Sequence, residues 1–106
     1  MEDLRRAVAA LGPIEEEESR SQVAFRLLGR SIARVWAPGQ YLGDQEAPLV
    51  LTLLFPERDN SPRWNAVVEP KPGVFTHHLE LHTASDIDDQ VRRWIERAWQ
   101  AARLLP

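Results

Sequence analysis

The chain has 106 residues, 43% of them hydrophobic and 27% charged, which suits one ordinary globular domain. Its formal net charge of −3 argues against a dedicated duplex-DNA binder, because such proteins gain most of their affinity from basic side chains on phosphates. The sequence contains no cysteine, which excludes disulfides and zinc sites built from thiolates.

The N-terminal residues 1–13, MEDLRRAVAALGP, predict a short helix that ends near Gly12 and Pro13. This charged start has no signal-peptide character, and no apolar run reaches the roughly 18 residues of a membrane span. We therefore expect a cytoplasmic protein that does not enter a membrane. Glu15–Glu18 follows, and so short a run of acids predicts a solvated loop. The helix presents one apolar stripe: Leu4, Ala7, Val8 and Leu11.

Residues 21–36, SQVAFRLLGRSIARVW, predict a β-hairpin because apolar side chains recur with period two. Gly29 and Arg30 suit a two-residue type II′ turn. That turn would pair Phe25 with Arg34. One face of the hairpin would then carry Arg34 as the charged member of an otherwise apolar row: Val23, Phe25, Leu27, Ile32 and Trp36.

Three more strands are expected after a loop at residues 37–48, which is rich in Gly, Pro and Asp. Leu49–Phe55 is apolar except at Thr52, which predicts a central strand covered on both faces. Residues 63–69 and 74–83 predict the fourth and fifth strands, joined by a turn that contains proline and glycine.

The last segment predicts a helix of about twenty residues. Ser85 is its expected N-cap, with Asp88 three residues on. Aspartates crowd the first turn, where the helix dipole favours anions, and they could pair with Arg92 and Arg93 at i,i+4 spacing. One apolar stripe is predicted to pack on the sheet: Ile87, Val91, Ile95, Ala98, Ala102 and Leu105.

This order of elements predicts an α+β fold in a single domain, with a five-stranded antiparallel sheet. The N-terminal and C-terminal helices are expected to pack on one face of that sheet. The other face would then be left uncovered, and a homodimer through it is one hypothesis. We expect a monomer or a weak homodimer.

All three histidines of the chain lie in FTHHLELHT, residues 75–83. On a strand His77 would share a face with leucines, whereas His78, Glu80 and His82 would share the other. His78 and His82 would stand ~13 Å apart, too far for a shared zinc ion with ligands at ~2 Å. We therefore expect no metal site and no cofactor.

His77 is expected to be a core histidine that makes one hydrogen bond, with a functional imidazole near Arg34 or Trp36 as the alternative. The same histidines also raise an enzymatic alternative. It is a small hydrolase or metal-dependent enzyme centred on His77, or on the face that carries His78, Glu80 and His82.

Four segments in order, GRSIARVW, VVEP, THHLEL and DIDDQVRRWIERAW, resemble an uncharacterised bacterial family of unknown function, DUF5655. The resemblance covers roughly residues 28–101 and leaves out the first helix and residues 37–48. One departure is Trp99, where the family usually has tyrosine, which removes a phenol oxygen. The family implies no established activity. More weakly, the order of elements is similar to the MmcQ/YjbR-like proteins, small α+β domains often described as DNA-binding.

Arginines on the first hairpin lie near tryptophans, which is typical of a platform for single-stranded nucleic acid. A structural interpretation is also open: Arg34 would lay its stem over the sheet and pair with a carboxylate or stack on Trp36. The leading hypothesis is a non-enzymatic binding module for a protein or nucleic-acid partner. No catalytic residue is assigned, and the candidate binding residues are Arg26, Arg34, Trp36, Trp64 and His77.

Overall fold

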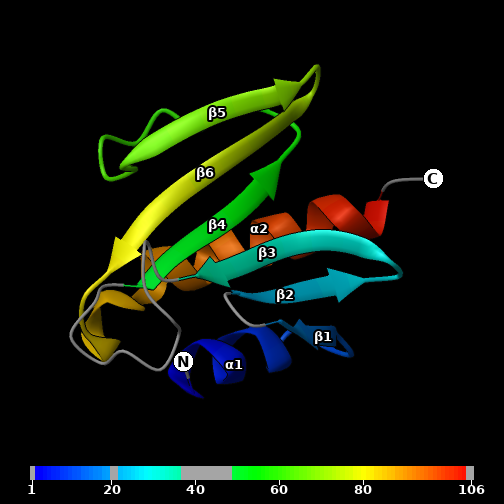
Figure 1. Cartoon of the computed structure of the whole chain (residues 1–106), viewed down its shortest axis with the longest axis vertical. Coiled ribbons are helices and arrows are strands. Elements are labelled where there is room, and N and C mark those ends of the chain that lie inside the picture. The colour runs from blue at the N-terminus through cyan, green and yellow to red at the C-terminus, as the bar shows by residue number, and fades with distance from the viewer. Residues whose placement is uncertain (1, 20–21, 37–48, 105–106) are drawn as a thin grey trace.

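The computed structural model describes residues 2–19, 22–36 and 49–104, so the loop predicted at 37–48 lies outside the described residues. Two helices and an antiparallel sheet give the predicted α+β class (Figure 1). The elements in chain order are α1 (Glu2–Ala9), β1 (Glu15–Glu18), β2 (Gln22–Leu27), β3 (Arg30–Trp36), β4 (Leu49–Phe55), β5 (Ala66–Lys71), β6 (Val74–Leu81), a 3₁₀ turn η1 (Ala84–Asp86) and α2 (Asp89–Leu104).

The sheet has six strands in the order β1-β2-β3-β4-β6-β5, so the prediction of five was wrong. The extra strand is β1, where Glu15–Glu18 pairs antiparallel with β2 instead of forming a loop. Its four side chains are all exposed, so the strand carries no apolar alternation that a sequence could reveal. Charged side chains on an edge strand also discourage pairing with another chain.

The β2–β3 turn consists of Leu28 and Gly29, both at positive φ (53° and 78°), as in a type I′ turn. The expected Gly29–Arg30 turn was therefore wrong by one residue. Leu27 pairs with Arg30 across the turn. This register change alone would not move Arg34 to the other face, but a second irregularity does.

Ile32 is an extra residue in β3. Arg26 pairs with Ser31, and the next pair is Phe25 with Ala33, so a β-bulge interrupts the ladder. Beyond the bulge, side-chain alternation is inverted relative to the expectation. Arg34 pairs with Ala24 rather than with Phe25 and leaves the apolar row, as does Trp36, while Val35 becomes fully buried.

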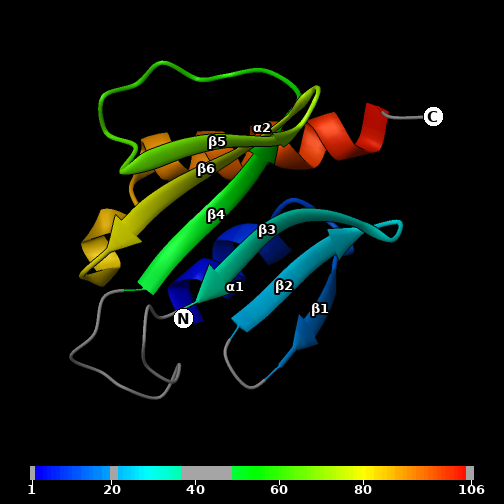
Figure 2. The same ribbon diagram turned by 45° about the horizontal axis from the view of Figure 1, so that its top comes forward.

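Helix α2 contacts β2, β3 and β4, and α1 contacts α2. Figure 2 shows both helices behind the sheet. Leu4 and Val8 of α1 are fully buried, as the helical stripe predicted. The predicted apolar stripe is buried at every described position: Ile87, which precedes α2, and Val91, Ile95, Ala98 and Ala102 of α2. Leu105 lies outside the described residues.

Helix α2 starts at Asp89 and is capped by Asp88, not by Ser85. The Asp88 carboxylate accepts a hydrogen bond from the Val91 N–H at 3.0 Å, as an N-cap does. Ser85 instead lies in η1. The expected i,i+4 pair from Asp88 is absent from the ion pairs of the described residues, because Asp88 turns to Arg63.

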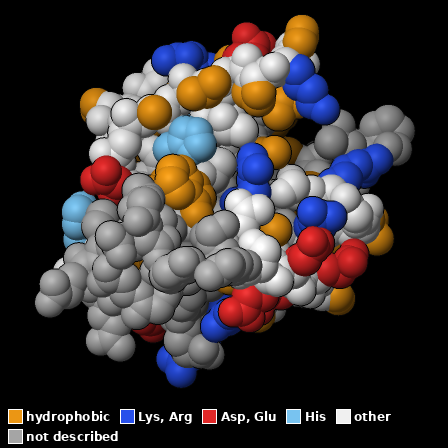
Figure 3. All heavy atoms as spheres, in the orientation of Figure 1, with side chains coloured by type: hydrophobic (Ala, Val, Ile, Leu, Met, Phe, Trp, Pro, Cys, Tyr) orange, Lys and Arg blue, Asp and Glu red, His pale blue; other side chains and the backbone are white. Residues whose placement is uncertain are grey.

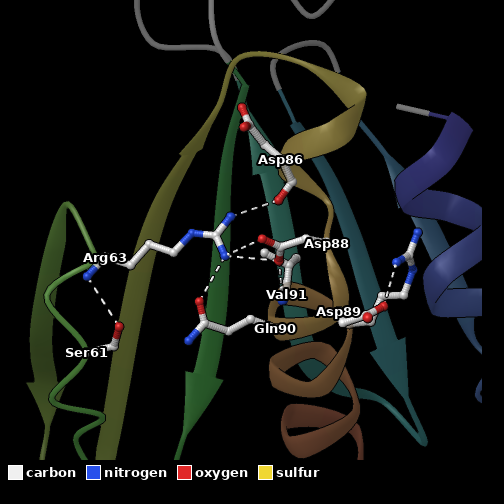
Figure 4. A network of polar contacts seen from close by, with 8 residues as sticks. Ser61, Arg63, Asp86, Asp88, Asp89, Gln90 and Val91 are labelled. Atoms are coloured by element: carbon white, nitrogen blue, oxygen red, sulfur yellow. Dashed lines mark hydrogen bonds and ion pairs between the residues drawn. The ribbon is translucent and has the colours of Figure 1, made fainter.

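Arg63, expected to begin the fourth strand, lies before β5 and fastens the β4–β5 connection to the start of α2 (Figure 4). Its Nη1 donates to both carboxylate oxygens of Asp88 and to Gln90 Oε1, at 2.9 to 3.0 Å. Its Nη2 donates to the Asp86 carbonyl at 2.9 Å. A guanidinium with four acceptors has a structural role here.

Candidate functional site

The face of the sheet away from α2, called the open face below, presents one row of side chains across its three central strands. Arg34 of β3 pairs with Thr52 of β4, and Thr52 pairs with His78 of β6. Trp36 lies two residues beyond Arg34 on the same face. Figure 3 shows this side of the molecule, with histidine, hydrophobic and basic side chains next to one another near its centre.

A chain of hydrogen bonds orients these side chains. Trp36 Nε1–H can only donate, and Thr52 Oγ1 accepts from it at 3.2 Å. Thr52 Oγ1 in turn lies 2.8 Å from His78 Nδ1. Thr52 is 1% exposed, so its hydroxyl has no access to water.

The His78 ring is neutral at pH 7, because burial and then the charge of Arg34 lower its pKa. A neutral ring carries one proton, and when the Thr52 hydroxyl donates to Nδ1 that ring proton lies on Nε2. In that tautomer the Nε2–H group has no hydrogen-bond partner among the described residues.

Arg34 is partly buried and has no counter-ion among the described residues. Its Nε is buried and has no hydrogen-bond partner. The stem thus lies over the sheet, as one interpretation of the sequence predicted, but without the expected carboxylate. Arg26 shares the open face, also has a buried Nε without a partner, and lies 3.5 Å from Glu17.

His77, next in sequence to His78, points to the opposite face and is 0% exposed. Its Nε2 accepts from the Asp59 N–H at 2.9 Å, so its proton lies on Nδ1, 3.2 Å from the Phe75 carbonyl. Its ring packs against Phe55 and Trp64 at centroid distances of 4.5 and 4.9 Å. Burial lowers its pKa, so the ring is neutral and both nitrogens are used.

Asp59 joins this buried histidine to the helix. Its carboxylate accepts from Trp64 Nε1 at 2.9 Å and from Arg97 Nη1 of α2 at 2.7 Å. Burial alone would raise the pKa of Asp59, but the hydrogen bonds from Trp64, Ser61 and Arg97 lower it. The cluster of His77, Asp59, Trp64 and Arg97, called the buried cluster below, therefore has its polar groups paired.

Comparison with known proteins bears on this arrangement. The sequence model of one family, "Domain of unknown function (DUF5655)", matches residues 1–102. The chain belongs to the DUF5655 family. The match includes α1 and residues 37–48, which the resemblance seen in the sequence left out. No curated protein and no solved structure matches the chain, and the similarity to MmcQ/YjbR-like proteins stays a prediction.

The five candidate binding residues of this DUF5655 domain fall into two groups. Arg26, Arg34 and Trp36 lie on the open face, whereas His77 and Trp64 belong to the buried cluster, with Trp64 only 8% exposed. Thr52, which links Trp36 to His78, was not among the residues predicted from the sequence. The sequence signal that could have identified Thr52 is its place as the one polar residue in the apolar strand Leu49–Phe55.

The enzymatic alternative rested on His77 or on the face that carries His78, Glu80 and His82. In this DUF5655 domain His82 follows the end of β6, and its Nε2 lies 3.4 Å from Glu80 Oε2. Within the described residues, no group of three histidines or acids is placed to hold a metal ion. No helix in the described part of the chain is long and apolar enough to cross a membrane.

Proposed function

We propose that this DUF5655 domain is a non-enzymatic binding module that takes up single-stranded nucleic acid on the open face of its sheet. The observation that carries the proposal is a group of side chains that offers donors and a ring together. Arg34 has no acceptor among the described residues, and His78 can offer its Nε2–H group. The Trp36 ring, at the end of β3, is partly exposed.

Each of these groups matches one part of a single strand. A phosphate only accepts hydrogen bonds at neutral pH, and a guanidinium is shaped to donate two of them side by side. Bases that are not paired stack on aromatic rings, and such stacking contributes ~1–3 kcal/mol per base. The hydrogen bond from Trp36 to Thr52 fixes the ring before a ligand arrives, so little side-chain freedom is lost on binding.

The acidic balance of the chain limits the affinity. Four of the acids form β1 at the edge of the sheet, and Glu80 lies on the open face itself. Few phosphates can therefore be neutralised, and we expect weak binding with a shallow dependence on salt. Sequence preference would come from the base on Trp36 and the donor of His78.

The test is a titration of protein with fluorescently labelled oligo-dT and oligo-U at low salt, followed by anisotropy. Arg34→Met should weaken binding about tenfold, since a charged hydrogen bond to phosphate contributes roughly 1.5–3 kcal/mol. The slope of log K against log salt should also fall by about 0.7 for each phosphate contact removed. Trp36→Leu should weaken binding at least as much, but leave the salt slope unchanged.

Arg93→Met is the matched control, because Arg93 is an exposed arginine of α2 on the other side of the sheet. It removes the same charge and should change the affinity less than twofold. Equal losses for Arg34→Met and Arg93→Met would mean that only net charge matters, and would contradict a site on the open face. Absence of binding to any single strand at low salt would direct attention to a protein partner instead.

A further inference from the structure

Leu28, at the tip of the β2–β3 hairpin, combines two features that cost stability. Its φ is 53°, a left-handed conformation that β-carbon-bearing residues other than Asn and Asp seldom adopt. Its side chain is 75% exposed, the larger of the two values for exposed large hydrophobic residues in the described chain. A type I′ turn requires the positive φ at this position but not a leucine, and Asn-Gly would suit the turn better.

A pocket of about 200 Å³ lies beside the turn of the same hairpin. Arg30 and Ser31 of β3 line one side of it. Arg30 Nη1 donates to the Ala102 carbonyl at 3.2 Å, which ties the hairpin to the C-terminal half of α2. The remaining walls are mainly apolar and include Leu54, Phe55, Val74, Ala98, Ala101 and Ala102.

The protruding leucine and the pocket lie at one end of the molecule. Figure 1 shows the β2–β3 turn and the C-terminal half of α2 at this end, as does the rotated view of Figure 2. Alanine side chains on α2 leave the pocket wide enough for one aliphatic group. This end of the molecule therefore carries both an exposed apolar side chain, Leu28, and an apolar pocket that could receive such a side chain from another copy.

We propose that the occupant of the pocket is Leu28 of a second copy of this chain. In a dimer with two-fold symmetry, a residue that contacts a site on the partner has its own site contacted in return. Leu28 of each copy would enter the pocket between β3 and α2 of the other. The backbone conformation of Leu28 holds the side chain outward, and burial in the partner recovers the apolar contact that the monomer lacks.

The proposed contact uses the tip of the β2–β3 hairpin and the pocket between β3 and α2, not the open face, so it is independent of nucleic-acid binding. It differs from the homodimer through the open face that the sequence suggested. Because each copy inserts one side chain, we expect a weak dimer that forms as the protein concentration rises.

Sedimentation equilibrium over a wide range of protein concentration tests the proposal. Leu28→Asn should raise the dissociation constant at least tenfold without lowering the melting temperature, because asparagine tolerates the left-handed conformation. Ala101→Leu fills the pocket from α2 and keeps Leu28, and it should also raise the dissociation constant. Val68→Asn is the matched control: Val68 is the other exposed large hydrophobic residue, at 50%, and its loss should leave the dissociation constant unchanged.

Cross-linking identifies the contact, and the absence of native cysteine makes it specific. Leu28→Cys and Ala101→Cys chains, mixed under oxidising conditions, should give a disulfide dimer of one chain of each kind in clear excess over dimers of either alone. A wild-type monomer at the highest concentration would overturn the proposal. So would a dimer that Leu28→Asn leaves intact, or cross-linking without preference for the mixed pair.

Discussion

His77 and His78 are neighbours in sequence and have opposite surroundings. His77 lies on the helix side, where its two ring nitrogens are paired with backbone groups of Asp59 and Phe75. His78 lies on the open face, where one nitrogen is paired with Thr52 and the other remains a donor. Burial lowers the pKa of both, so both rings are neutral at pH 7. The two rings therefore differ in how many of their nitrogens are hydrogen-bonded, not in charge, and only His78 keeps a nitrogen that could bind a ligand.

The same contrast holds for the arginines. Arg63 and Arg97 each donate to carboxylates that hold loops against α2. Arg34 has no such acceptor in the described chain. The guanidinium groups of Arg63 and Arg97 on the helix side are thus paired, whereas Arg34 on the open face is not. Four changes test this difference.

The largest effect is expected from His77→Ala. The change removes a fully buried ring from between Phe55 and Trp64 and leaves the Asp59 N–H without an acceptor. Cavity formation and the unpaired donor together should lower the free energy of unfolding by about 3–5 kcal/mol. Urea unfolding followed by tryptophan fluorescence measures it.

His78→Ala is the comparison, because it removes the same ring one residue away. It loses a partly exposed ring and one hydrogen bond to Thr52, which should cost only about 1 kcal/mol. Similar losses for the two variants would mean that the open face is packed as tightly as the buried cluster. The difference between the faces would then have no energetic basis.

Much of this architecture could be predicted from local pattern. The apolar stripe of α2, the central position of β4 and the extended conformation of the histidine segment all follow from periodicity. Periodicity fails where backbone geometry decides. The bulge at Ile32 inverts the alternation after it, and a run such as Ile32-Ala33 reads equally well without one.

Other errors came from pairing that local side-chain patterns do not encode. Glu15–Glu18 forms a strand through backbone bonds to β2, which its side chains do not announce. Asp88 caps α2 because Arg63, 25 residues away, fixes its carboxylate. For the candidate site, Arg34 and Trp36 could be named from the sequence. The face on which Arg34 lies and the link through Thr52 could not, because both depend on the register of neighbouring strands.

Asp59→Asn should have the next largest effect. The amide keeps one acceptor for Trp64 but loses the charge that accepts from Arg97 at 2.7 Å. A partly buried guanidinium left without its carboxylate should cost about 1–3 kcal/mol in urea unfolding. Glu57→Gln is the control: Glu57 also pairs with Arg97, but its side chain is 74% exposed, and its loss should cost at most about 0.5 kcal/mol.

Lowering the pH should weaken the fold, again mainly through the buried cluster. The folded-state pKa of His77 is lowered, chiefly by burial, below its ordinary value of 6.5. The unfolded chain therefore takes up a proton first as the pH falls below that value, and stability declines until the folded-state pKa is reached. Stability from this residue is fully present above pH 6.5.

Urea unfolding at intervals from about pH 7.5 to about pH 5 measures this decline. His77→Gln should flatten the profile, because no titrating ring remains in the core. His78→Gln should flatten it too, since the pKa of His78 is also lowered. A wild-type profile that is level over this range would contradict the assignment of both rings as neutral, desolvated groups.

The smallest effect on stability is expected from Arg34→Met. Methionine keeps the apolar stem over the sheet and removes a buried Nε that has no partner, so the free energy of unfolding should change by less than about 0.5 kcal/mol or rise slightly. Arg63→Met, which loses four hydrogen bonds at the start of α2, should cost about 1–2 kcal/mol in the same assay. If Arg34→Met were as costly as Arg63→Met, the guanidinium would have a structural task. Its donors would then not be available on the open face, and a loss of nucleic-acid binding in that variant would reflect unfolding rather than a missing contact.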